Sequence, residues 1–135
     1  MKKATTIMII TVLCAACLLS FCACGGNNEK EIKKILTEDG VAWVYSYAKD
    51  NNSAKIVLGF FDDGSVYMAH SVVLYGTDLG TTEKEGTFTI GESTIEITWN
   101  DGSTGRTLEY TYDSKSKSLT LTEFDGSNVY VKTRY

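Results

Sequence analysis

The feature that most constrains this chain is a strict alternation of apolar and polar side chains, which begins at Val41 and continues to the C-terminus. The clearest example is the segment 94–99, where Ile95, Ile97 and Trp99 alternate with threonine and glutamate. Successive side chains of a β-strand point to opposite faces of a sheet, so this period predicts strands with one face in a core and one in water. The absence of proline from the 135 residues agrees, because proline has no N–H to donate to a ladder.

Polar and glycine-containing segments divide this region into eight strands. Short turns are expected at 50–52, 62–64, 91–92, 100–102, 113–117 and 125–126, and one longer loop at 76–82. A strand and its turn then take about 12 residues, a spacing typical of a β-barrel or sandwich. Because short turns favour pairing between neighbouring strands, we predict an all-β fold, an eight-stranded antiparallel up-and-down barrel.

One short helix is predicted just before the first strand. Ile32, Ile35 and Leu36 recur with the i, i+3, i+4 spacing of a single apolar helix face. Gly40 is a natural terminator, because glycine readily adopts the left-handed conformation that ends many helices. A helix of about three turns needs tertiary packing to be stable, so we expect its apolar face to contact the barrel.

Residues 1–23 have the layout of a secretory signal peptide. Lys2 and Lys3 precede an uncharged apolar stretch at 4–23. The end of that stretch, Phe21-Cys22-Ala23-Cys24, resembles the lipobox of bacterial lipoproteins, in which a small residue precedes the cysteine that receives the lipid.

This resemblance implies that Cys24 is the lipidated residue, with Cys17 as the competing position. The polar segment 24–28 would serve as a tether, and 29–135 would be a single domain on the extracytoplasmic face of the cell envelope, held at the membrane by the lipid. The alternatives are an uncleaved transmembrane anchor, since twenty apolar residues can span a bilayer, and a plain secreted product.

Cysteine positions and charge exclude several classes of protein. The four cysteines all lie between Cys14 and Cys24, so the domain after them contains neither a disulfide scaffold nor a cysteine zinc site. Loss of residues 1–23 would remove two lysines and change the net charge from −4 to −6. An acidic domain argues against nucleic acid as a partner.

The order of several short motifs resembles the small lipocalin-like domains of bacterial lipoproteins. These motifs are a tryptophan on the first strand at 41–43, Phe-Phe-Asp-Asp-Gly-Ser at 60–65, Glu-Gly-Thr-Phe-Thr-Ile at 85–90, and the pair 110–113 and 118–121. The resemblance covers roughly residues 29–135. It implies a lipocalin-like barrel, and lipocalins proper bind small apolar ligands inside the barrel.

Seven side chains are candidates for lining such a ligand site, because their strand parity places them on the inward face. They are Trp43, Tyr45, Phe60, His70, Phe88, Trp99 and Tyr110. An eight-stranded barrel is just wide enough to be filled by side chains or to hold one small ligand, so a packed core and an open pocket both remain possible.

Two functions follow from these two interiors. The first is an anchored barrel that binds a small apolar ligand, and the second is a solid barrel that contacts an envelope protein through its surface, with 77–82 as the contacting loop. We expect no enzymatic activity, metal or cofactor, because His70 is the only histidine and no catalytic or metal-ligating set is legible around it.

The other notable polar and aromatic residues are expected to have structural roles and not to form a functional site. The Asp-Gly pairs at 63–64, 101–102 and 125–126 are expected to be turns, because a calcium loop needs more oxygen ligands at fixed spacing. Arg106 is expected at the barrel mouth. Tyr67, Tyr75 and Tyr130 are expected to be exposed.

Overall fold

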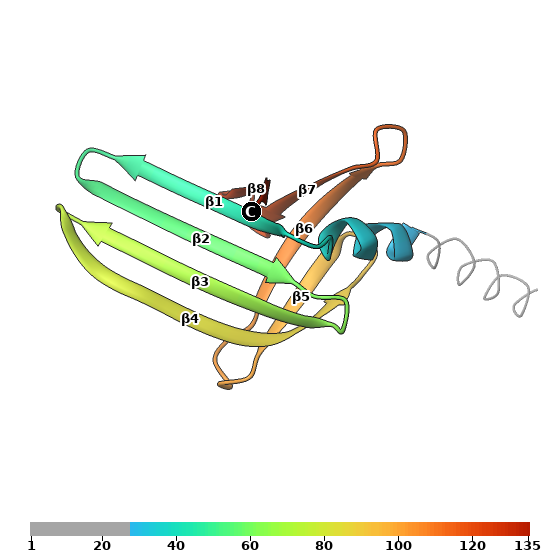
Figure 1. Ribbon diagram of the computed structural model, residues 1–135, viewed down its shortest axis with the longest axis horizontal. Coiled ribbons are helices and arrows are strands. Elements are labelled where there is room, and N and C mark those ends of the chain that lie inside the picture. The colour runs from blue at the N-terminus through green and yellow to red at the C-terminus, as the bar shows by residue number, and fades with distance from the viewer. Residues whose placement is uncertain (1–27) are drawn as a thin grey trace, which may run out of the picture.

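A single antiparallel sheet that closes on itself organises the structure (Figure 1). The computed structural model describes residues 28–135, so the expectations for the segment 1–23 and for Cys24 lie outside the described residues. Each strand pairs with its neighbours in sequence, and β1 closes onto β8, which confirms the predicted eight-stranded up-and-down barrel. The strands are β1 (Val41–Lys49), β2 (Asn52–Phe60), β3 (Ser65–Leu74), β4 (Thr77–Ile90), β5 (Thr94–Trp99), β6 (Arg106–Asp113), β7 (Ser118–Glu123) and β8 (Val129–Arg134).

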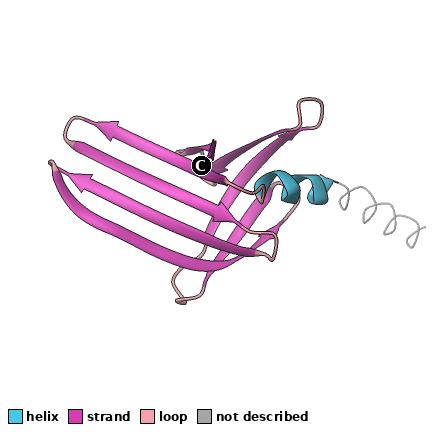
Figure 2. Ribbon diagram, in the orientation of Figure 1, coloured by secondary structure: helices cyan, strands magenta, loops and turns pink. Residues whose placement is uncertain are grey.

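The predicted helix occupies residues 28–36 and packs at one end of the barrel (Figure 2). Ile32 and Leu36 are buried in the same hydrophobic cluster as Trp43 of β1. The Trp43 indole N–H also donates a hydrogen bond of 3.3 Å to the Leu36 carbonyl oxygen, which has no partner within the helix. We call this end of the molecule the helix end, and the opposite end, where the loops β5–β6 and β7–β8 lie, the mouth end.

The two halves of the sheet differ in strand length. The first four strands contain 9, 9, 10 and 14 residues, whereas the last four contain 6, 8, 6 and 6. β8 therefore pairs with β1 only along Val41–Val44, and β5 pairs with β4 only along Gly86–Ile90. The rest of β1–β4 continues past the mouth as a four-stranded sheet, which we call the sheet extension (residues 45–56 and 70–84; Figure 1).

The expectation of a long loop at 76–82 is wrong, because β4 already begins at Thr77. β3 and β4 are joined by a two-residue turn, Tyr75-Gly76, in which both residues have positive φ (52° and 77°), the combination required by the type I′ turns of tight hairpins. The ladder between β3 and β4 shifts register between Ser71 and Val73, and Gly80 in the opposing stretch of β4 has a φ of 89°. The segment reads as a loop in the sequence because this stretch, exposed on both faces, has little apolar alternation to reveal it.

Tyr130 is also a correction to the sequence prediction, because it is only 2% exposed. It pairs with Leu121 of β7 and points into the barrel, which turns its neighbours Val129 and Val131 outward. Tyr75 is exposed as expected, and Tyr67 is half-buried. The sequence left the inward face of 129–133 open, because Tyr130 and its valine neighbours are all apolar enough to be buried; the structure turns the valines to the solvent and the tyrosine to the core.

Gly86 marks the point where β4 passes from the sheet extension into the barrel. A Cβ atom at this position would overlap the carbonyl oxygen of Thr98 on β5. By contrast, a Cβ at Gly59 in β2 would make only ordinary contacts of 3.7 Å and more, with the ring of Phe61. Gly86 is therefore needed for the close approach of β4 and β5.

We predict that Gly86→Ala lowers the free energy of unfolding by about 1–3 kcal/mol, the usual effect of inserting a methyl group into a packed site. Gly59→Ala is the matched control in another strand interior, and it should change stability by less than about 1 kcal/mol. Urea unfolding followed by circular dichroism measures both. Equal effects of the two substitutions would contradict the close approach.

Candidate functional site

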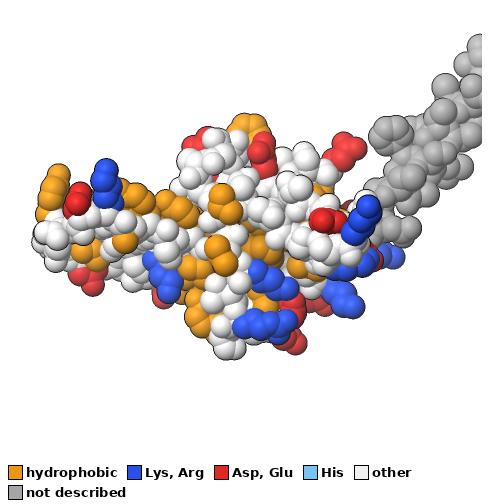
Figure 3. All heavy atoms as spheres, turned by 90° about the horizontal axis from the view of Figure 1, so that it is seen from above, with side chains coloured by type: hydrophobic (Ala, Val, Ile, Leu, Met, Phe, Trp, Pro, Cys, Tyr) orange, Lys and Arg blue, Asp and Glu red, His pale blue; other side chains and the backbone are white. Residues whose placement is uncertain are grey.

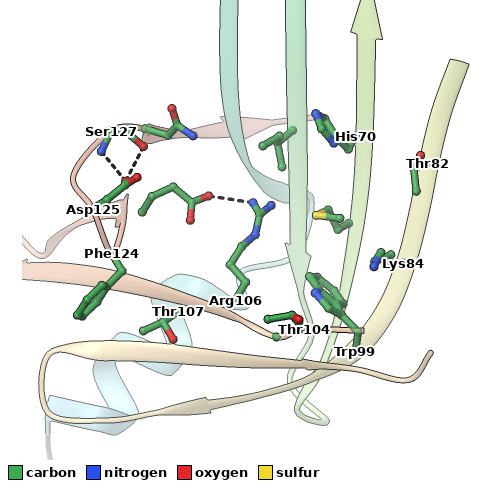
Figure 4. A pocket seen from close by; sticks show the side chains of 15 residues that line it. His70, Thr82, Lys84, Trp99, Thr104, Arg106, Thr107, Phe124, Asp125 and Ser127 are labelled. Carbon is green, nitrogen blue, oxygen red and sulfur yellow. Dashed lines mark hydrogen bonds and ion pairs between the residues drawn. The ribbon is translucent and has the colours of Figure 1, made fainter. Parts of the chain in front are cut away.

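A cleft of about 790 Å³ opens at the mouth end of the barrel (Figure 4). One wall is the concave face of β2, β3 and β4, and the other is built by the loops that join β5 to β6 and β7 to β8. Its apolar surface comes from Ile56, Met68 and Trp99. Its polar surface includes His70, Thr82, Lys84, Arg106 and Glu123.

The cleft exists because the aromatic core fills only the part of the barrel toward the helix end. Trp43, Phe60 and Phe88 are at most 8% exposed, and the rings of Phe60 and Phe88 meet edge to face with centroids 5.1 Å apart. Met68 and Trp99 form the last buried layer before the mouth. Beyond them the short strands β5–β8 end, so no facing side chains fill the space over His70 and Thr82.

A half-buried polar network lies on the wall of the cleft, centred on Arg106. Its Nη1 donates to Glu123 Oε1 at 2.9 Å and to the hydroxyl oxygen of Tyr130 at 2.8 Å. The Tyr130 hydroxyl in turn donates to Glu123 Oε1 at 2.5 Å. Both hydrogen bonds of the guanidinium use Nη1, which leaves Nη2 and Nε able to donate to a group in the cleft. The Arg106 side chain extends from the start of β6 into the cleft (Figure 4).

This network changes the ionisation of Tyr130. Burial is the main cause that raises the pKa of its hydroxyl well above the ordinary value of 10, and the hydrogen bond to Glu123 adds to it. The positive charge of Arg106 acts in the opposite direction and does not outweigh these effects. Tyr130 is therefore held as a neutral donor throughout the physiological range.

Lys84 lines the cleft from β4 and is held by the β5–β6 loop. Its Nζ lies 3.2 Å from Asp101 Oδ2 and donates to Ser103 Oγ at 2.5 Å. Hydrogen bonds from the Ser103 side chain and backbone, with a smaller contribution from Lys84, lower the pKa of Asp101 to about 2. The positive charge of Lys84 is therefore balanced by Asp101, and its side chain still lines the cleft.

The two loops that border the cleft share one turn motif, Asp-Gly-Ser. In the turns that start at Asp63, Asp101 and Asp125, the aspartate Oδ1 accepts the backbone N–H of the serine two residues later at 2.9 Å, and the central glycine has positive φ. These contacts confirm the prediction that the Asp-Gly pairs are turns. The serine of each motif completes the turn. The triplet Asp-Gly-Ser occurs three times in the sequence, so this shared turn could have been predicted from it.

The structure divides the seven predicted ligand-lining residues into three groups. His70 and Trp99 line the cleft. Trp43, Phe60 and Phe88 are buried in the packed core and do not reach it. Tyr45 and Tyr110 are half-buried at opposite ends of the barrel, Tyr45 with its ring 6.2 Å from that of Tyr130, and Tyr110 with its hydroxyl on the carbonyl oxygens of Gly91 and Glu92.

Lys84, Thr82 and Glu123 are cleft residues that the sequence reading missed. Lys84 and Thr82 have the same parity as Phe88, so extending the β4 alternation toward its start would have found them. Glu123 likewise continues the parity of Leu119 and Leu121 in β7. Arg106 lies at the mouth end as predicted.

Comparison of the chain with protein-family models and with curated proteins gives no match. Between residues 28 and 135, histidine, cysteine and carboxylate side chains form no group of three that could hold a metal ion. No helix in that same range is long and apolar enough to cross a bilayer.

We predict that Tyr130→Phe lowers the free energy of unfolding by about 1.5–3 kcal/mol at neutral pH, because the hydroxyl bonds to two charged groups. The matched control is Tyr135→Phe, whose ring is 76% exposed, and it should have almost no effect.

Tyr130→Phe should also change how the stability of the protein depends on pH. Because folding raises the pKa of Tyr130 above 10, the unfolded chain loses this proton first, so stability falls as the pH rises above 10. Denaturant unfolding from about pH 9 to about pH 12, the range around the ordinary tyrosine pKa, should show a shallower decline of stability for Tyr130→Phe than for the parent. Identical slopes would show that the buried hydroxyl is not coupled to folding.

Proposed function

We propose that this chain is a membrane-anchored extracytoplasmic lipoprotein whose lipocalin-like barrel binds a small amphipathic ligand in the cleft at its mouth. The observation that supports this most strongly is the cleft itself. Its volume of about 790 Å³ lies within the range of roughly 300–1,000 Å³ typical of small-molecule sites. A barrel filled along its whole length would have offered no such space.

The side chains that line the cleft indicate how an amphipathic ligand would be oriented in it. Met68, Ile56 and Trp99 line the cleft with apolar side chains that suit the hydrophobic part. The free donors of Arg106 face the same space and suit an oxyanion or a carbonyl oxygen, since a guanidinium is always charged and can only donate. Because Glu123 already neutralises Arg106, the ligand is held by hydrogen bonds more than by net charge.

The proposed location at the membrane rests on the sequence of the first 28 residues. A lipid on Cys24 would hold the chain at the membrane, and the described domain begins only four residues later, at residue 28. The helix at 28–36 packs at the end of the barrel opposite the cleft (Figure 1). In this arrangement the mouth would face away from the membrane, toward solutes of the extracytoplasmic space.

We predict that the chain without residues 1–23, once shown by circular dichroism to keep its strands, binds the anionic probe anilinonaphthalene sulfonate with an increase in fluorescence. His70→Trp should abolish this binding by filling the cleft. Ser71→Trp is the matched control, because the neighbouring residue of β3 points to the opposite face of the sheet. Arg106→Met should weaken binding about tenfold or more, the effect of losing a hydrogen bond to a charged group. Undiminished binding in His70→Trp would exclude the cleft as the site.

A separate prediction concerns the anchor. In a bacterial host fed an alkyne-bearing fatty acid, the full chain should become labelled and sediment with membranes, and Cys24→Ala should lose both properties. Cys17→Ala should keep them. Loss of label in Cys17→Ala alone would move the lipid to the competing cysteine, and an unlabelled parent chain would contradict the lipoprotein proposal.

A further inference from the structure

The sheet extension leaves one edge of β4 without a backbone partner. β3 pairs with β4 along almost its whole length, but on the other side β5 pairs only with Gly86–Ile90. The last backbone contact on that side is the N–H of Asn100, which donates to the Glu85 carbonyl oxygen at 2.9 Å. Within residues 28–135, no strand lies against the stretch 77–84 on this side.

Strand alternation shows which groups of β4 are free. The N–H and C=O of one residue in an antiparallel strand point to the same side, and the side changes at each residue. Since the Glu85 carbonyl points toward β5, the N–H and C=O groups of Thr81 and Glu83 also point to that side, where nothing pairs with them. A row of such groups is a template for another extended chain.

The convex face beside this edge is acidic. Asp78, Glu83 and Glu85 project from it, and no ion pair among residues 28–135 includes any of the three. Lys84 lies on the opposite, concave face and is engaged by Asp101. The nearest lysine in the ladder on the convex face is Lys55, two strands away opposite Ser71.

The concave face beside the same edge is apolar and open to solvent. Leu79 of β4 is 61% exposed and Leu74 of the adjacent β3 is 43% exposed, whereas Tyr47, 45% exposed, lies on β1 at the other edge of the sheet extension. Hydrophobic side chains are visible along the elongated part of the molecule in the space-filling view (Figure 3). Exposed apolar side chains beside an unpaired edge promote aggregation. Natural proteins therefore either protect such an edge or use it to bind a partner.

We propose that the free edge of β4 binds an extended segment of a partner protein in which basic residues alternate with apolar ones. The backbone of that segment would pair with Thr81 and Glu83. Its basic side chains would lie against Glu83 and Glu85 on the convex face, and its apolar side chains would lie beside Leu79 on the concave face. This interaction is independent of ligand binding in the cleft.

A second copy of the chain fits the edge less well. Antiparallel pairing of two β4 edges would bring the glutamates of both copies together on one face, and like charges opposite each other destabilise a strand pair. The free part of β1, residues 45–49, carries only Ser46 and Ala48 on its convex face, and its one lysine, Lys49, lies on the concave face, away from the position of the glutamates. The same carboxylates that oppose self-pairing therefore favour a basic partner.

The experiment uses the full chain in dodecyl maltoside micelles and a fluorescein-labelled seven-residue peptide in which lysine alternates with valine. Fluorescence anisotropy should show saturable binding. A peptide with glutamate in place of lysine should not bind. A lysine–valine peptide whose pairing backbone amides are N-methylated keeps its charge and should also fail to bind, because it cannot form the ladder.

Protein variants test the position of the binding site. Glu83→Gln combined with Glu85→Gln should weaken peptide binding roughly three- to tenfold. The charge-matched control is Glu96→Gln combined with Glu109→Gln, on strands paired at both edges, and it should leave binding unchanged. Circular dichroism confirms the fold of each variant.

Four results would overturn the proposal. The first is the absence of binding at millimolar peptide. The second is equal binding of the N-methylated peptide, and the third is equal loss of binding in both double variants; either would mean diffuse charge attraction. The fourth is self-association of the chain that blocks the peptide, measured by sedimentation, which would assign the edge to a second copy.

Discussion

Unequal strand length is the constraint on which the rest of this structure depends. An antiparallel barrel closes only where every strand has two neighbours, so its height is set by the shortest strands. Here β8 covers four residues of β1 and β5 covers five residues of β4, while β3 and β4 pair well beyond that height. The molecule is consequently a short closed barrel continuous with an open four-stranded sheet.

This difference resolves the choice between a packed interior and a pocket. Toward the helix end, all eight strands contribute side chains, and Trp43, Phe60 and Phe88 fill the interior completely. Toward the mouth only the first four strands continue, so the same inward face that buries Met68 leaves His70 half-buried and exposes Leu74. The cleft and the free edge of β4 are thus two results of one mismatch. The Arg106–Glu123–Tyr130 network lies at the boundary, where a partly buried charge needs a partner.

Much of the fold could be predicted from the sequence, because the alternation in segments such as 94–99 has a direct physical cause in the two faces of a sheet. The site was harder to predict. Trp43 and Trp99 have the same inward parity, yet one is covered by the helix and the other borders the cleft, and only the heights of neighbouring strands distinguish them. The start of β4 at Thr77 and the burial of Tyr130 were missed for a related reason, since polar or exposed strand segments show weak or misleading alternation.

Amide hydrogen exchange of the full chain, followed residue by residue by NMR, tests the sheet extension most directly. Thr82 and Lys84 should exchange slowly because alternation directs their N–H groups to β3, whereas Thr81 and Glu83, between them on the free edge, should exchange nearly as fast as an unstructured peptide. Residues 87–89 should all be protected, because the N–H groups of Thr87 and Thr89 point to β5 and that of Phe88 donates to the Gly64 carbonyl oxygen. Equal protection of Thr81, Thr82, Glu83 and Lys84 would contradict this account, because it would mean that a strand covers the edge that the unequal lengths leave open.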